Sequence, residues 1–431
     1  MSLTKVINFL KGNLGIMTFS SGIWTIAGQL VWPFQSIYIL SLGGSYFHIG
    51  LISSIGAFSS LLPTLYGGIL ADSMGRKKII TSMSFVLSIN SLLYAFARDW
   101  RWIVAASVFN ALASGLRQPA FNSIIADSTE ESSRAQSYAV WSVVPPIFGL
   151  ASPYFMGVYM DRYGVKEMIR LGYIALGATS FIASLIRHLY LEETLDLSNN
   201  DTGVTRLGVV DGLYDTVNNL SHPLMILGFM GLFFGFGAAV GGPFWITYAT
   251  KDIIKLSMSQ WGLITAANTF IGVVVGLPLS RVADRQGRLK LLYPSIILTP
   301  FAIIGFINCT NFIQTFVISM VITVLGSMGM SSGQALFTDL TDPSHRGRIN
   351  SLWSVAGTMQ SFSVGSSPGS LMGAAGNLFG GYLYENMSKS LPLYIQSAMV
   401  GVTAVTGVLF LSEPDKTARV ESVGDMSSPE N

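Results

Sequence analysis

Long apolar stretches, separated by short segments that hold most of the charged residues, dominate this chain. A bilayer core of about 30 Å needs roughly 20 helical residues, and a helix satisfies its own backbone polar groups in lipid. The apolar stretches are too long for barrel strands. Twelve of them reach the required length, near residues 14–40, 47–71, 79–97, 102–126, 136–160, 170–190, 223–249, 258–280, 290–308, 312–337, 350–383 and 391–412. The pattern predicts an all-α membrane protein with twelve transmembrane helices.

Composition agrees with this interpretation. Half of the 431 residues are hydrophobic and 11% are charged, whereas a soluble domain carries about 25% charged residues. The net charge of +2 gives no electrostatic footprint for nucleic acid. The single cysteine, Cys309, excludes an intramolecular disulfide. A soluble enzyme would need a charged surface that this composition does not supply.

The polar segments divide the chain into two halves. The longest one predicts a cytoplasmic linker at 192–222, between an N-terminal six-helix bundle at 1–191 and a C-terminal one at 223–412, with a disordered cytoplasmic tail at 413–431. The loops on the side of the termini hold about twice as many Lys and Arg residues, Arg187 among them, as the opposite loops. Since cytoplasmic loops are the more basic ones, we expect a multi-pass protein of the cell membrane with both termini cytoplasmic.

An internal repeat relates the two halves. A shift of 212 positions superposes Gly50 on Gly262, Asp72 on Asp284, Gly75-Arg76 on Gly287-Arg288, Asp127 on Asp339, and Arg134 on Arg346. Six spans in each half make the repeats parallel, related by an axis along the membrane normal. The repeat predicts two six-helix bundles that enclose a cavity, which rocking of one bundle would expose to each side in turn. The predicted eleventh span is about ten residues longer than its counterpart, which indicates a broken or kinked helix there.

The loop between the second and third spans carries a recognisable motif. It reads Gly68-Ile-Leu-Ala-Asp72-Ser73-Met-Gly75-Arg76-Lys77-Lys78. This resembles the signature of the major facilitator superfamily, Gly-x-x-x-Asp-(Arg/Lys)-x-Gly-Arg-(Arg/Lys), with Ser73 in place of one basic residue. The second half keeps Asp284-Arg285-Gln286-Gly287-Arg288, with Ser280 in place of the leading glycine. The resemblance extends over the whole chain in span count and repeat, and it implies the 6+6 fold of that family.

In that family such charges form a latch that holds the cytoplasmic side closed. The resemblance therefore implies a latch here, made by Gly68, Asp72, Gly75, Arg76, Asp127, Arg134, Asp284, Gly287, Arg288, Asp339 and Arg346. The residue types also make physical sense alone: Gly68 would admit a neighbouring helix, Gly75 a tight turn, and Arg76 a carboxylate partner. The alternative is that the basic residues only set the topology.

The fifth predicted span retains part of a further motif. Many antiporters of the family carry Gly-Pro-x-x-Gly-Gly there, and Ser152-Pro153-Tyr-Phe-Met156-Gly157 keeps the proline and the last glycine. A helix kink without a role in the mechanism explains these residues equally well.

Candidate cavity residues lie on the first and seventh spans and opposite them. Gln29, Trp32, Gln35 and Tyr38 are spaced along one helical face. Trp245 and Tyr248 mirror them in the second half, and Asn110, Asn268 and Gln334 add neutral hydrogen-bonding groups. Arg117 is the only basic residue placed well inside a predicted span, where it either binds an anionic group or reaches towards the cytoplasmic end. For each aromatic residue, packing between helices is the competing interpretation.

These features favour a secondary active transporter that moves a small organic solute by alternating access. Efflux in the manner of a proton antiporter leads, and proton-coupled or facilitative uptake of a nutrient remains an alternative. A non-transporting membrane sensor or scaffold is the alternative of another class. No enzyme, cofactor or metal site is expected. The expected partners are the solute, the lipid bilayer and protons as the candidate coupling ion, for a protein that acts as a monomer.

Overall fold

The computed structural model describes residues 12–129, 134–195, 220–341 and 371–411. Within these ranges the regular structure is helical. Ten described helices are long and apolar enough to span a membrane. A further helix, α6, occupies the predicted fourth span, and α17 occupies the last part of the predicted eleventh span, whose earlier part lies outside the described residues. The fold class expected from the sequence is confirmed.

The first half forms one bundle. Its elements are α2 (Gly12–Val31), η1 (Trp32–Phe34), α3 (Gln35–Ser41), α4 (Tyr46–Met74), α5 (Arg76–Ala95), α6 (Trp100–Asp127), α7 (Arg134–Phe148), α8 (Ser152–Tyr163) and α9 (Val165–Tyr190). The fifth span is thus broken into α7 and α8. Pro153 stands in the first turn of α8, where its missing N–H costs nothing.

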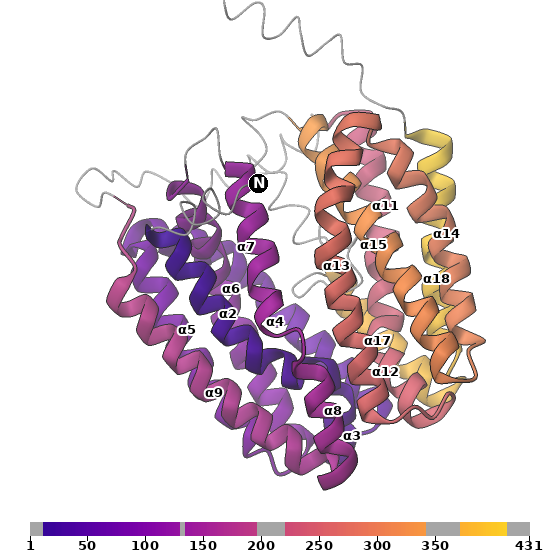
Figure 1. Cartoon of the computed structure of the whole chain (residues 1–431), viewed down its shortest axis with the longest axis horizontal. Coiled ribbons are helices and arrows are strands. Elements are labelled where there is room, and N and C mark those ends of the chain that lie inside the picture. Colours follow the sequence, from indigo (N-terminus) through magenta and orange to yellow (C-terminus); the bar gives the residue numbers. More distant parts are fainter. Residues whose placement is uncertain (1–11, 130–133, 196–219, 342–370, 412–431) are drawn as a thin grey trace, which may run out of the picture.

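The second half forms the other bundle. Its elements are α11 (His222–Gly241), η4 (Gly242–Phe244), α12 (Trp245–Thr247), η5 (Tyr248–Asp252), α13 (Met258–Gln286), α14 (Leu289–Ile307), α15 (Phe312–Leu340), α17 (Leu371–Asn386) and α18 (Leu391–Phe410). Figure 1 shows the two bundles side by side. We call the end where α2 begins and α18 ends the proximal end, and the opposite end the distal end.

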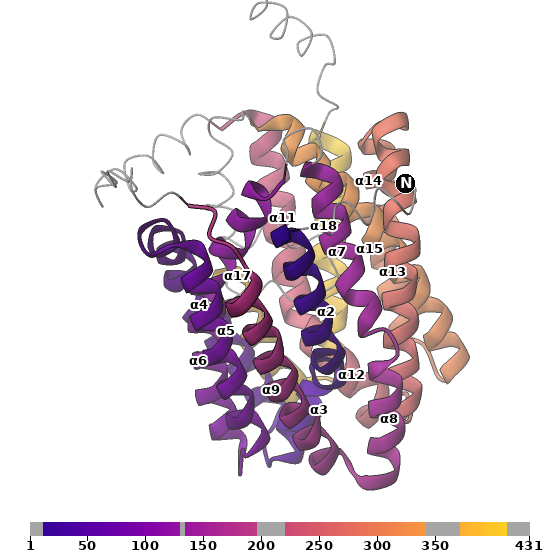
Figure 2. The same cartoon turned by 60° about the vertical axis from the view of Figure 1, so that its left-hand side comes forward.

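The bundles meet through two pairs of helices. α4 packs against α17, and α8 packs against α13 (Figures 1 and 2). Hydrogen bonds between the bundles occur at the distal end, as in the bond from Ser36 Oγ to the carbonyl oxygen of Pro243 (2.7 Å). The closest contacts between the bundles are therefore at the distal end.

Local sequence explains where the helices begin and end. The carboxylate of Asp99 accepts a hydrogen bond from the N–H of Arg101 (2.8 Å) and caps α6. Ser257 and Gln260 form a reciprocal capping box at the start of α13. Gly75 and Gly287 have φ of 92° and 106°, which glycine adopts without a Cβ penalty, so both can turn the chain tightly between antiparallel helices.

The predicted close approach at Gly68 is wrong by one position. A Cβ on Gly68 would meet nothing nearer than 3.9 Å, whereas one on Gly67 would lie 2.7 Å from the carbonyl oxygen of Leu116. Gly67 is the buried residue of the two. A helix needs its small residue on the face that touches its neighbour, and the motif alone did not fix that face.

The first span does not present one continuous face. A short 3₁₀ turn at Trp32–Phe34, with Pro33 at its start, separates α2 from α3. The equivalent turn, Gly242–Phe244 with Pro243, interrupts the seventh span. Residues before and after each turn therefore point in directions that a regular helix would not give them.

Candidate functional site

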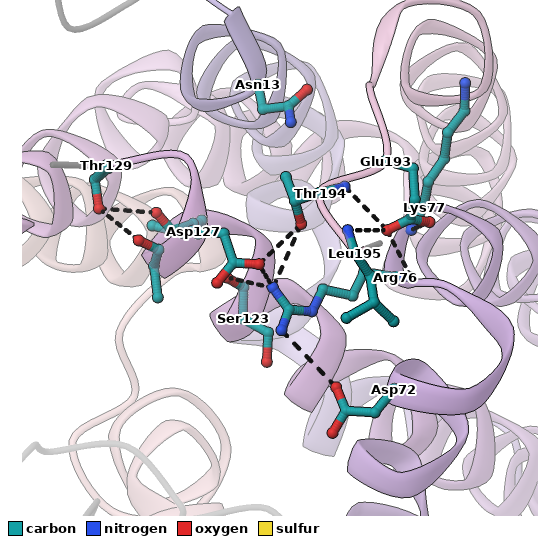
Figure 3. Close-up of polar contacts among 12 residues, drawn as sticks. Asn13, Asp72, Arg76, Lys77, Ser123, Asp127, Thr129, Glu193, Thr194 and Leu195 are labelled. Atoms are coloured by element: carbon teal, nitrogen blue, oxygen red, sulfur yellow. Dashed lines mark hydrogen bonds and ion pairs between the residues drawn. The ribbon is translucent and has the colours of Figure 1, made fainter. Parts of the chain in front are cut away.

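The proximal end of the first bundle carries a charge cluster around Arg76 (Figure 3). The Arg76 guanidinium forms an ion pair with Asp127 at the end of α6 and lies 3.8 Å from the Asp72 carboxylate. It also reaches the carbonyl oxygen of Ser123 (3.5 Å). The Arg76 side chain is only 13% exposed, compared with 34% for Asp127 and 58% for Asp72. The pair with Asp127 is therefore the better shielded contact.

Two residues that the sequence did not single out complete this cluster. The Glu193 carboxylate accepts hydrogen bonds from the backbone N–H groups of Arg76 (3.1 Å) and Lys77 (2.9 Å), and so caps α5. The Thr194 hydroxyl donates to Asp127 (2.9 Å). Both residues were assigned to the linker, but residues 192–195 lie against the first bundle (Figure 3). The feature of the sequence that could have identified Glu193 is its position as an acidic residue just after a predicted span.

The second bundle repeats the central ion pair. Arg288 Nε lies 3.1 Å from an Asp339 carboxylate oxygen, between α14 and α15. Arg346 and the side chains of Arg134 and Asp284, which belong to the predicted latch, lie outside the described residues. Each described ion pair links neighbouring helices of the same bundle, so in this conformation it does not join the two bundles.

The distal end holds one interface between α4 and α17. The Glu385 carboxylate accepts a hydrogen bond from the backbone N–H of Phe47 (2.5 Å), in the first turn of α4. A Cβ on Gly50 would collide with the carbonyl oxygen of Asn377, and the Cα of Gly50 lies within 3.1 Å of the Cβ position of Gly381. The two backbones are therefore in direct contact.

A second distal interface joins α8 to α13. The Asp161 carboxylate accepts hydrogen bonds from the N–H groups of Met258 and Ser259, each at 2.9 Å. A Cβ on Gly157 would collide with the carbonyl oxygen of Met258, and one on Gly262 with that of Pro153. A carboxylate at a helix N-terminus and paired glycines thus recur here.

The two distal interfaces are equivalent under the internal repeat. Gly50 and Gly262 correspond at the shift of 212 positions, as Phe47 and Ser259 do. Gly157 corresponds to Gly381, and Asp161 to Glu385, at a shift of 224. These acids do not coincide at the shift of 212 positions because the eleventh span contains additional residues. Allowing that insertion would have revealed the shared Gly-x-x-x-acid pattern.

Aromatic residues extend the α4–α17 interface. The hydroxyls of Tyr46 and Tyr384 donate to the two oxygens of the Asp252 carboxylate, the second at 2.7 Å. The Lys389 ammonium lies 3.9 Å from the centre of the Tyr46 ring. Because Tyr46 belongs to one bundle and the other residues to the second, this network also connects the bundles.

A cavity of about 180 Å³ with both polar and apolar walls lies on the bundle interface, between α3, α4, α5, α6 and α17. Its walls are formed by Gln35, Ile52, Ser53, Gly56, Ala57, Ser60, Tyr94, Ser107, Asn110, Ala111, Ser114 and Asn377. Two of the predicted cavity residues, Gln35 and Asn110, are among them. Asn377 is buried and its side-chain carbonyl oxygen has no hydrogen-bond partner. The cavity offers neutral donors and acceptors.

The other predicted cavity residues do not line this cavity. Tyr38 and Tyr248 are buried within their own bundles and donate to the carbonyl oxygens of Tyr94 (2.8 Å) and Ile307 (2.7 Å). The 3₁₀ turns that precede them explain this orientation. Four others also lie elsewhere: Trp32 packs on Trp24, Trp245 donates to Gln396, Gln334 is exposed, and Asn268 is half-buried on α13. Gln29 is half-buried at the end of α2.

Arg117 is buried inside the first bundle, and it is not alone there. It is 8% exposed, and Arg187, which the sequence assigned to a cytoplasmic loop, is 3% exposed in α9. Both guanidinium groups donate to the hydroxyl of Ser84, at 3.3 Å and 3.2 Å. The loop assignment of Arg187 was wrong because this arginine lies in the last turn of α9, on the buried face of that helix.

Two parallel bundles of apolar helices, related by a repeat and joined at one end, define a membrane transporter architecture. The model of the Major Facilitator Superfamily matches residues 15–248 and 227–426. The chain therefore belongs to this superfamily and is one of its transporters.

Individual relatives are distant. The uncharacterized transporter YhjO of Bacillus subtilis is 24% identical over 345 residues, which cover 78% of this chain and 80% of that protein. The multi-drug resistance efflux pump PmrA of Streptococcus pneumoniae is 22% identical over 312 residues, 70% of this chain and 73% of the pump. Among solved structures, a POT family transporter in complex with 5-aminolevulinic acid superposes with a TM-score of 0.69 at 10% identity, covering 92% of this chain and 95% of that one.

Proposed function

We propose that this transporter is a secondary active carrier that moves a small organic solute by alternating access, in the efflux direction. One observation carries the proposal: the two equivalent distal interfaces, each with a carboxylate on a helix N-terminus and glycines in backbone contact. Contacts of this kind hold two rigid bodies without interlocking large side chains. They can therefore separate and re-form as one bundle rocks against the other.

With cytoplasmic termini, the distal end would face the outside of the cell. The conformation described above would then be closed outside, and the solute would enter from the cytoplasm. The ion pairs Arg76–Asp127 and Arg288–Asp339 would stiffen each bundle in this state. The cytoplasmic latch, with Asp72 as a member, would form between the bundles in the opposite state. The moving domains would be residues 1–191 and 223–412 of a monomer.

The solute that the cavity favours is an uncharged or amphipathic organic molecule. Gln35, Asn110 and Asn377 offer amide donors and acceptors without a carboxylate. An unpartnered amide oxygen at Asn377 is costly when buried, so a ligand that donates a hydrogen bond to it would relieve this cost. Efflux is supported by the similarity to PmrA, which is named as an efflux pump.

Flux in reconstituted liposomes tests this proposal. Purified protein is screened for compounds that raise its melting temperature, and each hit is then followed across the membrane with and without an imposed pH gradient. Accumulation of the solute in the direction opposite to proton flow supports proton-coupled antiport. Accumulation in the same direction as proton flow indicates proton-coupled uptake. Binding without flux under either condition would overturn the transport proposal and favour a sensor. Asn377→Ala should raise KM, with Ser60→Ala as the control because its hydroxyl already bonds to Ala57.

A further inference from the structure

Two arginines, Arg117 and Arg187, are buried together in the first bundle. Among the described residues, neither the Arg117 nor the Arg187 guanidinium contacts a carboxylate. Their partners are serine hydroxyls and the ring of Phe121, whose centre lies 4.8 Å and 4.9 Å from the two guanidinium carbons, and for Arg117 also the ring of Trp24 at 5.7 Å. Hydroxyls and aromatic faces stabilise a cation but do not neutralise it. Two uncompensated charges in an apolar bundle are costly, and an anion would remove that cost.

The two guanidinium groups are engaged to different extents. Arg187 donates from Nε to Ser20 (2.8 Å), from one terminal nitrogen to Ser84 and from the other to Ser21 (3.1 Å). Among the described residues, Arg117 donates from Nη1 to Ser84 (3.3 Å), and its buried Nε has no partner there. Arg187 is therefore held in place, while the buried Nε edge of the Arg117 guanidinium keeps unused hydrogen-bonding capacity within the described part of the chain.

We infer that Arg117, supported by the charge of Arg187, binds the carboxylate group of a small organic anion. The Nε edge of an arginine presents two parallel N–H groups, whose spacing matches the two oxygens of a carboxylate. Arg117 is buried and is not part of the cavity wall, but it follows Ser114 and Asn110 of that wall by three and seven residues, so the three residues share one face of α6. The proposed site is thus about one helical turn from the cavity wall, towards the proximal end.

The carboxylate can come from two sources: the acid group of the transported solute, or a separate anion that binds beside a neutral solute. The site itself does not depend on the proposed direction or coupling of transport. It is therefore tested by binding, in a measurement that contains no transport step.

The test is thermal unfolding of the purified full-length protein in detergent, with sodium acetate replacing sodium methanesulfonate at constant ionic strength. We expect a saturable rise in melting temperature with acetate for the wild type and for Arg98→Gln, an exposed arginine of the distal end. Arg117→Gln should abolish the rise. Arg117→Lys, which keeps the charge but lacks the two-pronged edge, should weaken acetate binding by about tenfold.

Two results would overturn the inference: no rise in the wild type when acetate replaces methanesulfonate, or an undiminished rise in Arg117→Gln. If Arg117→Gln does not fold, the wild type and Arg117→Lys decide the question alone. Acetate that competes with solute flux identifies the solute as the source of the carboxylate, and acetate that promotes flux identifies a separate anion. Absent flux with intact acetate binding would count against the proposed function only.

Discussion

The carboxylate of Asp161 accepts hydrogen bonds from the backbone amides of both Met258 and Ser259, each at 2.9 Å, across the boundary between the two bundles. These amides are in the first turn of α13 and have no partner within their own helix. An anion there is also favoured by the helix dipole. One side chain of the first bundle thus completes a helix of the second, and Glu385 does the same for α4 in return.

Removing this carboxylate should weaken distal closure. A helix cap contributes about 1 kcal/mol, so Asp161→Ala should shift the population towards the distally open state by roughly fivefold. Double electron–electron resonance between spin labels at Phe96 and Ile313, which are exposed on different bundles at the distal end, measures this shift in a Cys309→Ser background. Asp99→Ala removes a cap within one bundle and should leave the distances unchanged. Equal effects of the two substitutions would contradict the assignment.

The glycines of the distal interfaces should be equally sensitive. In Gly262→Ala the new methyl group would collide with the carbonyl oxygen of Pro153, and overpacking of this kind costs about 1–3 kcal/mol. The same distance measurement should therefore report a distally open protein. Gly272→Ala, in the same helix but with nothing within 4 Å of its Cβ position, is the control. A closed distal end in Gly262→Ala would show that the backbones need not touch.

Substitutions of the two carboxylates beside Arg76 should affect stability and transport differently. Asp127→Asn breaks the better shielded ion pair and should lower the free energy of unfolding by about 1 kcal/mol. Asp72→Asn should have a smaller effect on unfolding, because that carboxylate is mostly exposed and 3.8 Å away. If Asp72 belongs to the cytoplasmic latch, its substitution should nevertheless slow transport. Thermal unfolding and solute flux measure the two quantities, and undiminished flux in Asp72→Asn would remove Asp72 from the latch.

Glu193 should control the start of α5. Without its carboxylate the N–H groups of Arg76 and Lys77 lose their acceptor, so Glu193→Ala should speed hydrogen exchange in the first turn of α5. Glu192→Ala is the matched control, since Glu192 is held to Asn13 through its backbone. Unchanged exchange in Glu193→Ala would mean that solvent satisfies these amides equally well.

The sequence predicted the bundles, the turn glycines Gly75 and Gly287, and the acidic residues of the described ion pairs, Asp72, Asp127 and Asp339. These features depend on periodicity and on residues repeated at one offset, which are visible in a single chain. The orientation of Tyr38 was not predictable, because a 3₁₀ turn of three residues redirects the helix after Val31. Arg187 was assigned to a loop because, in the sequence, an arginine buried near the end of a span cannot be distinguished from one in a cytoplasmic loop.

The distal contacts show a further limit of sequence reasoning. In the sequence, Asp161 and Glu385 are simply acidic residues just after predicted spans. Their role as helix caps depends on their position opposite the starts of α13 and α4. Which helix of the other bundle they face depends on how the bundles dock, and docking is not encoded in local periodicity.

Locking the distal end covalently tests the central claim, that the bundles must separate there for transport. In a Cys309→Ser background, Ser36→Cys with Pro243→Cys would join the bundles, because the Ser36 hydroxyl bonds to the Pro243 carbonyl oxygen at 2.7 Å. Ser397→Cys with Pro300→Cys places the same pair of residues, in the same contact at 2.9 Å, within the second bundle. After oxidation to a disulfide, we expect solute flux to stop in the first variant, to return on reduction, and to persist in the second. Full flux through the oxidised Ser36–Pro243 variant would contradict alternating access by separation of the distal interfaces.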